Sequence, residues 1–267
     1  MQKATLDWGE IDGITRTWFS ETLRELREKG TNTSQPDYAL FVLVEYCLIV
    51  CAEYRDAAFD AFRNGRFYAG SNNLRPILEH AIHLWWCGSD RSDVSGRLDV
   101  WEKAAAPQHK KLCEAWRDMK PARSAEWKEC DKKAAFWRGV IDKRKQVAEV
   151  PNLWKMAESL KDNSEAPDAV VSFYPVYREL SQSSHATLDL DEVFKSRDGA
   201  LIAHARREMR WMMPVDALYV PLALVSAAHA FFDRERPVLG RGFQEAKLIL
   251  DRHYSEAAQQ NESRTDQ

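Results

Sequence analysis

Apolar positions recur at helical spacing along most of the chain, with charged side chains between them. From Asp7 to Lys29 the apolar residues fall three or four positions apart, which places them on one face of a helix, and Gly30 closes this segment. The same pattern predicts further helices over Asp37–Asn64, Asn72–Trp86, Ser92–Met119, Ala122–Glu149, Asn152–Lys161, Asp168–His185, Met212–Phe232 and Phe243–Ala257.

No series of alternating strands and no fixed-period repeat interrupts this pattern, so the predicted fold is an all-α helical bundle. The segments Tyr38–Asn64, Asn72–Trp86, Asp168–His185 and Met212–Phe232 have the longest apolar stripes and must cover one another. We interpret residues 188–199 as a loop or a short helix, and residues 200–207 as an extended edge segment. Residues 1–267 are predicted to form a single helical domain, with residues 259–267 as a disordered tail.

Residues 92–149 differ from the rest because they are rich in both charge and tryptophan. Lys120-Pro121 separates two helical segments here. Pro107 is expected either to kink the first of these segments or to start a new helix within it. Their large aromatic residues, Trp101, Trp116, Trp127, Phe136 and Trp137, are spaced for one buried stripe on each helix. This predicts a long helical hairpin that projects from the main body.

Composition narrows the function classes. The chain has 267 residues and a formal net charge of −3. This charge counts against a protein whose affinity for nucleic acid depends on the release of counterions from the phosphates. The most apolar segment, Tyr38–Ala52, is too short for a membrane span and carries Glu45, so no membrane partner is predicted. Five cysteines without a Cys-x-x-Cys pair or a signal peptide indicate reduced thiols in a cytoplasmic protein, with no metal and no cofactor.

A first polar cluster lies in the segment Phe173–His185. Arg178, Ser181 and His185 are spaced at i, i+3 and i+7, so a helix would project all three from one face. Tyr174 lies one turn before Arg178, and Tyr177 lies four residues before Ser181. Because such a stripe usually carries Leu or Val, this pattern favours a polar site within a helical protein.

A second polar cluster lies on the predicted helix Asn72–Trp86. Arg75 and Glu79 are four residues apart in an otherwise apolar segment, and His83 follows on the same face. A structural ion pair with a capping histidine explains this pattern as simply as a binding site does. The di-iron bundle motif Glu-x-x-His is absent, so we predict no metal here. We expect the helices that carry Glu79 and Arg178 to be neighbours whose buried charges compensate one another.

Together the two clusters resemble a bacterial family of uncharacterised helical proteins, catalogued as a domain of unknown function. The shared elements are Leu-Arg-x-x-x-Glu at residues 74–79 and Tyr-Arg-x-Leu-Ser-x-x-x-His at residues 177–185. The resemblance covers roughly residues 40–250 and implies no established activity.

A looser resemblance is to the HEPN superfamily of helical nucleases, in which an arginine precedes a histidine by four to six intervening residues. Arg178 and His185 have six residues between them, and Arg75 and His80 have four. The resemblance implies metal-independent RNA cleavage, often at a dimer interface and often in toxin or phage-defence systems. Histidine can transfer the protons in such a reaction, and arginine can bind the phosphate oxygens.

Three functions therefore stay open. The first is a HEPN-like metal-independent endoribonuclease, a toxin or phage-defence effector, in which Arg178 and His185 are catalytic and RNA is the substrate. The second is a non-catalytic module that binds a small ligand or nucleotide through Tyr174, Tyr177, Ser181, Arg75, Glu79 and His83. The third is an interaction scaffold in which the tryptophan-rich hairpin docks a partner. A homodimer is compatible with each of them.

Overall fold

A computed structural model describes residues 7–30, 35–90, 93–104, 106–144, 151–160, 173–182, 194–197, 200–203, 207–232, 241–242 and 244–255. Its labelled helices are α1 (Trp8–Gly30), α2 (Gln35–Arg63), α3 (Phe67–Gly88), α4 (Val94–Ala104), α5 (Ala106–Asp118), α6 (Ala125–Arg144), α7 (Leu153–Ser159), α8 (Phe173–Gln182) and α10 (Arg207–Phe232). Residues 244–255 form one more helix. The prediction of an all-α fold is confirmed.

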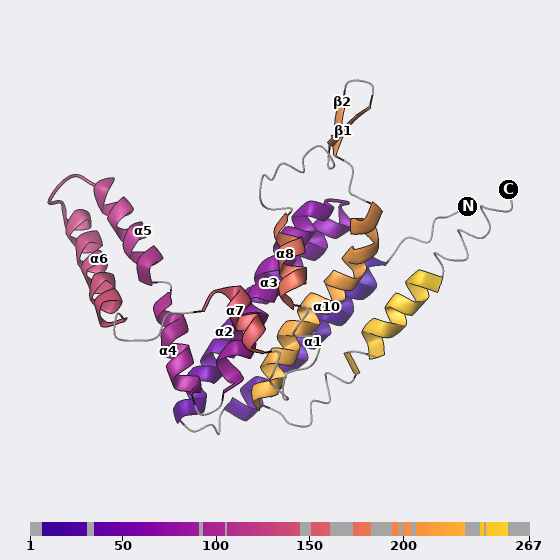
Figure 1. Cartoon of the computed structure of the whole chain (residues 1–267), viewed down its shortest axis with the longest axis horizontal. Helices are drawn as coiled ribbons and strands as arrows, with labels where there is room; N and C mark the ends of the chain where they lie inside the picture. Colours follow the sequence, from indigo (N-terminus) through magenta and orange to yellow (C-terminus); the bar gives the residue numbers. More distant parts are fainter. Residues whose placement is uncertain are drawn as a thin grey trace.

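The bundle is organised around α3, which packs against α2 on one side and α10 on another (Figure 1). Helix α1 lies across α2 and α10, while α7 and α8 cover the remaining side of α3. Helix α3 has neighbours on several sides, and its apolar residues are fully buried between them: Leu74, Ile77, Leu78, Ala81 and Ile82. Burial of this apolar surface is the main source of the bundle's stability.

The close packing of α2 on α3 depends on Gly70. A β-carbon at this position would lie 2.2 Å from the ring of Phe62, closer than any non-bonded contact allows. Gly65 has a φ of +69°, in the left-handed region that favours glycine, and it ends α2 so that the chain can reverse into α3. The apolar pattern predicted the start of this helix at Asn72, whereas α3 begins at Phe67.

Helices α4, α5 and α6 leave the bundle. The segment predicted as one helix from Ser92 to Met119 is two helices, and α5 begins at Ala106, directly before Pro107. Helices α5 and α6 pack side by side and form an arm that projects from the bundle beyond α4 (Figure 1). We call residues 106–144 the arm. The projecting hairpin was predicted over residues 92–149, whereas only α5 and α6 form it and α4 is a separate helix.

A short antiparallel hairpin lies between α8 and α10. Strand β1 (Phe194–Arg197) pairs with β2 (Ala200–Ala203), so that Phe194 is opposite Ala203 and Arg197 is opposite Ala200. The extended conformation predicted from Ala200 is confirmed as far as Ala203. The prediction of a loop or short helix is wrong for residues 194–197, because main-chain pairing with β2 outweighs their local sequence preference. Helix α10 also begins earlier than predicted, at Arg207.

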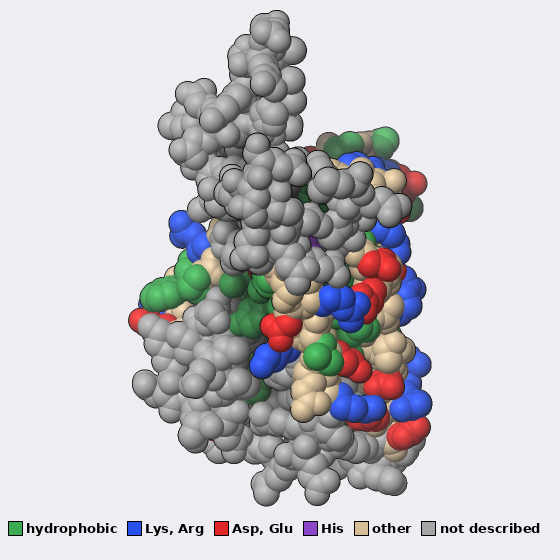
Figure 2. Space-filling model, turned by 90° about the vertical axis from the view of Figure 1, so that its right-hand side faces the viewer, with side chains coloured by type: hydrophobic (Ala, Val, Ile, Leu, Met, Phe, Trp, Pro, Cys, Tyr) green, Lys and Arg blue, Asp and Glu red, His purple; other side chains and the backbone are tan. Residues whose placement is uncertain are grey.

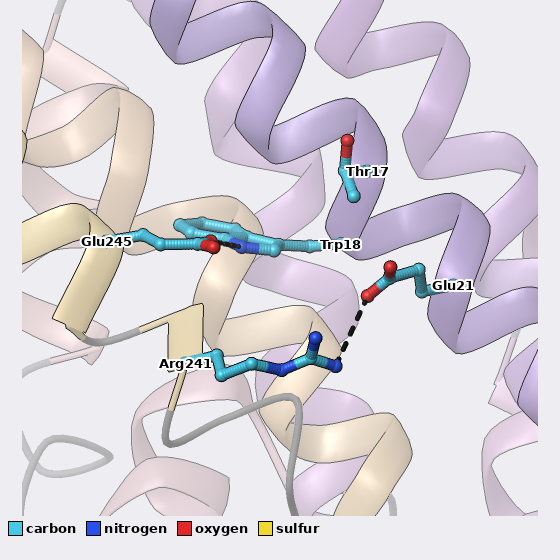
Figure 3. Close-up of a pocket in the computed structure, with 5 residues that line it drawn as sticks. All are labelled: Thr17, Trp18, Glu21, Arg241 and Glu245. Carbon is cyan, nitrogen blue, oxygen red and sulfur yellow. Dashed lines mark hydrogen bonds and ion pairs between the residues drawn. The ribbon is translucent and has the colours of Figure 1, made fainter.

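The C-terminal helix, residues 244–255, docks on α1. The indole Nε1 of Trp18 donates a hydrogen bond to Glu245 Oε2 at 2.9 Å, and Arg241 lies 3.7 Å from Glu21 (Figure 3). These residues and Thr17 enclose a cavity of only about 50 Å³, which is too small for an organic ligand. Figure 2 views the end of the molecule opposite the arm, where positive and negative side chains alternate among the described residues.

Cys47 and Cys51 pack in the core as small apolar side chains. Among the residues that the structure describes, no helix is long and apolar enough to cross a membrane.

Candidate functional site

Three aromatic rings form a row where α7 and α8 meet on α3. The rings of Trp154 and Tyr174 have centroids 4.9 Å apart, and those of Tyr174 and Tyr177 are stacked with centroids 6.0 Å apart. Arg75 reaches this row from α3. We call Trp154, Tyr174, Tyr177 and Arg75 the aromatic–arginine cluster.

Arg75 and Tyr177 join the two sequence motifs. The guanidinium Nη2 of Arg75 donates a hydrogen bond to the phenol oxygen of Tyr177 at 3.0 Å, and its Cζ lies 5.1 Å from the centre of the same ring. Tyr177 thus accepts a hydrogen bond and a cation–π contact from one side chain. The prediction that the helices carrying the two motifs are neighbours is confirmed.

The polar residues of α8 have different environments. Arg178 is exposed and forms no ion pair with the residues that the structure describes. Ser181 is buried, and its hydroxyl donates to the main-chain oxygen of Tyr177 at 2.6 Å, within the helix itself. Tyr174 and Tyr177 are half-buried and keep one side against the core. Of this stripe, Arg178 is therefore the side chain that faces outward, while the two phenol rings are only partly exposed.

His83 is held as a neutral imidazole on α3. Its Nδ1 lies 2.8 Å from the carbonyl oxygen of Glu79, which can only accept a hydrogen bond, so Nδ1 carries the proton. Burial disfavours the charged form and lowers the pKa of His83 from 6.5 to about 4, although the hydrogen bond to Glu79 opposes this shift. His80 makes the same type of contact with Pro76 at 2.7 Å.

The expected compensation between buried charges is wrong for Arg178. Arg178 lies at the surface, and it forms no ion pair with Glu79. The physical reason is that α8 turns its aromatic side to α3 and leaves its guanidinium in water, where no counter-charge is required. His185, proposed as a catalytic residue, lies outside the described residues, since α8 is described only to Gln182.

Sequence reasoning missed the buried ionic network between α1 and α2. Arg55 is only 1% exposed, and its guanidinium donates to Asp12 Oδ1 at 2.9 Å and also to Asp56. Asp12 additionally pairs with Arg63 at 2.7 Å and with Arg16 at 3.5 Å. The sequence signal was an arginine in the second half of a core helix, with an aspartate on the preceding helix.

A groove of about 340 Å³ runs along the outer side of this network. Its walls are formed by side chains of α1 and α2: Arg16, Phe19, Ser20, Leu23, Leu48, Ile49, Ala52, Glu53, Arg55 and Asp56. The Arg55 Nε at its base has no hydrogen-bond partner among the described residues. The groove is mainly apolar, with charged groups at one end.

No group of three or more His, Cys, Asp or Glu side chains in the described part of the chain is arranged to hold a metal ion. The described geometry is that of an all-α bundle protein with a polar and aromatic surface on α3, α7 and α8. The chain belongs to a family of unknown function, DUF5677, whose model matches residues 42–201. This range includes both motifs and ends before α10 begins. Neither the curated proteins nor the solved structures contain a match to the chain.

Proposed function

We propose that the protein binds single-stranded RNA at the aromatic–arginine cluster. The observation that carries this proposal is the row of three rings with a guanidinium against one end. Proteins bind single strands by stacking bases on aromatic side chains and by placing cations along the phosphates. Both elements are present on one surface of this bundle.

Exposure supports a role for each group. Trp154 is 40% exposed at the end of the row, so its ring can accept a base. Arg178 lies one helical turn after Tyr174 and is exposed, so it can contact a phosphate next to a stacked base. Lys155, adjacent to Trp154, is also exposed and adds a second positive charge.

Binding to a fluorescent, uridine-rich RNA measured by anisotropy tests the proposal. Trp154→Ala should weaken binding by about 1–3 kcal/mol, the contribution of one stacked base. Arg178→Ala should weaken binding and reduce the slope of log affinity against log salt by about 0.7, because one phosphate contact is lost. Arg24→Ala, which removes an exposed arginine from α1, is the matched control and should leave the affinity unchanged.

Equal affinity for wild type and both cluster variants would refute the proposed site. Preference for duplex over single-stranded RNA would also refute it, because bases in a duplex are not free to stack on the protein.

The second candidate function is metal-independent cleavage of the bound RNA, as a HEPN-like nuclease in a toxin or phage-defence system. The resemblance of Arg178 and His185 to the HEPN pattern supports it, together with the exposure of Arg178 beside the rings. In this reaction the ribose 2′-hydroxyl loses its proton, its oxygen attacks the adjacent phosphorus, and the 5′-oxygen leaves with a proton. His185 would transfer a proton, and Arg178 would bind the phosphate oxygens.

Incubation of the purified protein with single-stranded RNA, with and without EDTA, tests cleavage. His185→Ala should abolish cleavage without changing RNA affinity, whereas Arg178→Ala should reduce both, and EDTA should have no effect. RNA that is bound but not cleaved would reject the nuclease and leave the RNA-binding proposal intact.

A further inference from the structure

The arm exposes the apolar side of α5. Leu112, Trp116 and Met119 are 55%, 50% and 74% exposed, and their spacing of i, i+4 and i+7 places them on one face. The opposite face of α5, which packs on α6, is polar. Arg117 pairs across to Asp131 at 3.0 Å, and Glu114 pairs across to Arg138 at 3.7 Å. Helix α5 therefore turns its charged side inward and its apolar side to solvent.

The arm has little core of its own. Of its described side chains, only Ala106 and Ala134 are buried. A helix that turns its polar face toward a neighbouring helix and exposes its apolar face is expected to have a partner on the apolar side, because exposed apolar stripes of this kind mark interaction sites.

The arm is also basic, while the rest of the chain is acidic. Residues 106–144 contain eleven Lys and Arg against six Asp and Glu, a net charge of +5, which leaves −8 for the other residues. Within the arm, Glu114, Asp118, Glu126, Glu129 and Asp131 all pair with arm cations. Lys111, next to Leu112, forms no ion pair with the described residues.

A complementary face lies on α2. Tyr38, Val42, Tyr46 and Ile49 are all exposed and repeat every three or four residues, which forms a second apolar stripe. Ile49 also lines the apolar groove between α1 and α2. Glu53, one turn further along this face, is exposed and forms no ion pair with the described residues.

We propose that α5 of one copy of this chain docks on α2 of a second copy. Leu112, Trp116 and Met119 pack on the α2 stripe, and the Trp116 indole enters the groove beside Ile49. Lys111 then lies near Glu53 of the second copy, so that the basic arm meets the acidic bundle. Reciprocal exchange of the two arms closes a dimer with two equal interfaces.

Charge favours this arrangement over contact between two arms. Each arm carries +5, so two arms repel one another. Antiparallel packing of two α5 stripes, with Leu112 against Met119, would also oppose Lys111 to Lys120. Contact between an arm and a bundle pairs opposite charges and covers both exposed stripes at once.

Light scattering after size-exclusion chromatography of the full chain tests the dimer. Wild type should have twice the 30.8 kDa mass of the chain at micromolar concentration, and high salt should promote dissociation. Trp116→Ser and Ile49→Ser should each raise the dimer dissociation constant at least about 30-fold, as expected for residues at the centre of an interface. Leu248→Ser, at a residue 65% exposed on the C-terminal helix, is the control and should remain dimeric.

Mixing the two variants separates this interface from any symmetric one. The Trp116→Ser chain keeps an intact α2, and the Ile49→Ser chain keeps an intact arm, so the mixture should regain one interface and form a heterodimer. A monomeric wild type overturns the proposal. A dimer that survives both substitutions, or a mixture that stays monomeric when both variants are folded by circular dichroism, overturns it as well.

Discussion

Arg75 donates a hydrogen bond to the Tyr177 hydroxyl at 3.0 Å, across the boundary between α3 and α8. The two residues are 102 positions apart in the sequence, and this contact brings the two polar clusters into one surface. It also holds Tyr177 in line with Tyr174, so the contact positions the ring row that we propose as the RNA site.

Removing one hydroxyl tests the energetic value of this contact. Tyr177→Phe should lower the free energy of unfolding by about 1–2 kcal/mol, because a partly buried guanidinium loses a hydrogen-bond acceptor. Tyr174→Phe removes a hydroxyl that has no hydrogen-bond partner among the described residues, and it should change stability much less. Urea unfolding followed by circular dichroism measures both, and equal effects would contradict the assigned hydrogen bond.

The buried network around Arg55 predicts a larger effect at Asp12. Asp12→Asn removes the carboxylate shared by Arg55 and Arg63, so a guanidinium that is 1% exposed loses part of its compensation. We expect a loss of about 3–5 kcal/mol in thermal or urea unfolding. Asp60→Asn breaks the exposed pair with Arg66 and should cost less than about 1 kcal/mol. A similar cost for both substitutions would show that the network is solvated.

The lowered pKa of His83 predicts a pH-dependent stability. The His83 imidazole takes up a proton near pH 6.5 in the unfolded chain, but only near pH 4 in the folded chain. Between these two pH values the unfolded state therefore binds one more proton than the folded state. This contribution, on the order of 3 kcal/mol, is fully present above pH 6.5 and is lost as the pH falls toward 4. His83→Gln should flatten the decline between pH 6.5 and 4, whereas His109→Gln, at an exposed residue of α5, should not. An unchanged profile for His83→Gln would exclude this role.

Thiol reactivity should divide the five cysteines into two groups. Burial raises the pKa of the Cys47 and Cys87 thiols to about 12, and it raises the pKa of Cys51 as well. These three should not react with a thiol reagent in the folded protein, because the reactive form is the thiolate. Cys113 and Cys130, partly exposed on the arm, should react. Rapid reaction of more than two thiols before denaturation would show that the core opens.

Periodicity predicted the helices well because burial of an apolar stripe dominates the energetics of each helix. It identified the neighbours α3 and α8 from polar residues that needed a common environment. It could not show which side chain would make the contact, since Arg75 had both Glu79 and a tyrosine within reach. The choice depends on how α8 is rotated about its axis, which is set by the packing of Tyr174 and Tyr177 on the core.

Other features depend on contacts that local patterns do not contain. The strand at Phe194–Arg197 exists through pairing with β2, and the buried Asp12–Arg55 pair joins residues 43 positions apart. The spacing of Trp116 predicted a buried position, yet α5 faces α6 with its charged side. The spacing of residues in the sequence shows which of them lie on the same face of a helix. Tertiary packing decides which face another element covers.

Photo-crosslinking shows whether RNA binds at the aromatic–arginine cluster, because it identifies the residues in contact with the RNA. Single-stranded RNA containing 4-thiouridine is bound to the full protein, irradiated and digested, and the crosslinked peptides are identified by mass spectrometry. We expect crosslinks at Trp154, Tyr174 or Tyr177, and we expect their loss when unlabelled single-stranded RNA competes. Crosslinks confined to other segments, or none at an RNA concentration that saturates binding, would contradict binding at this cluster.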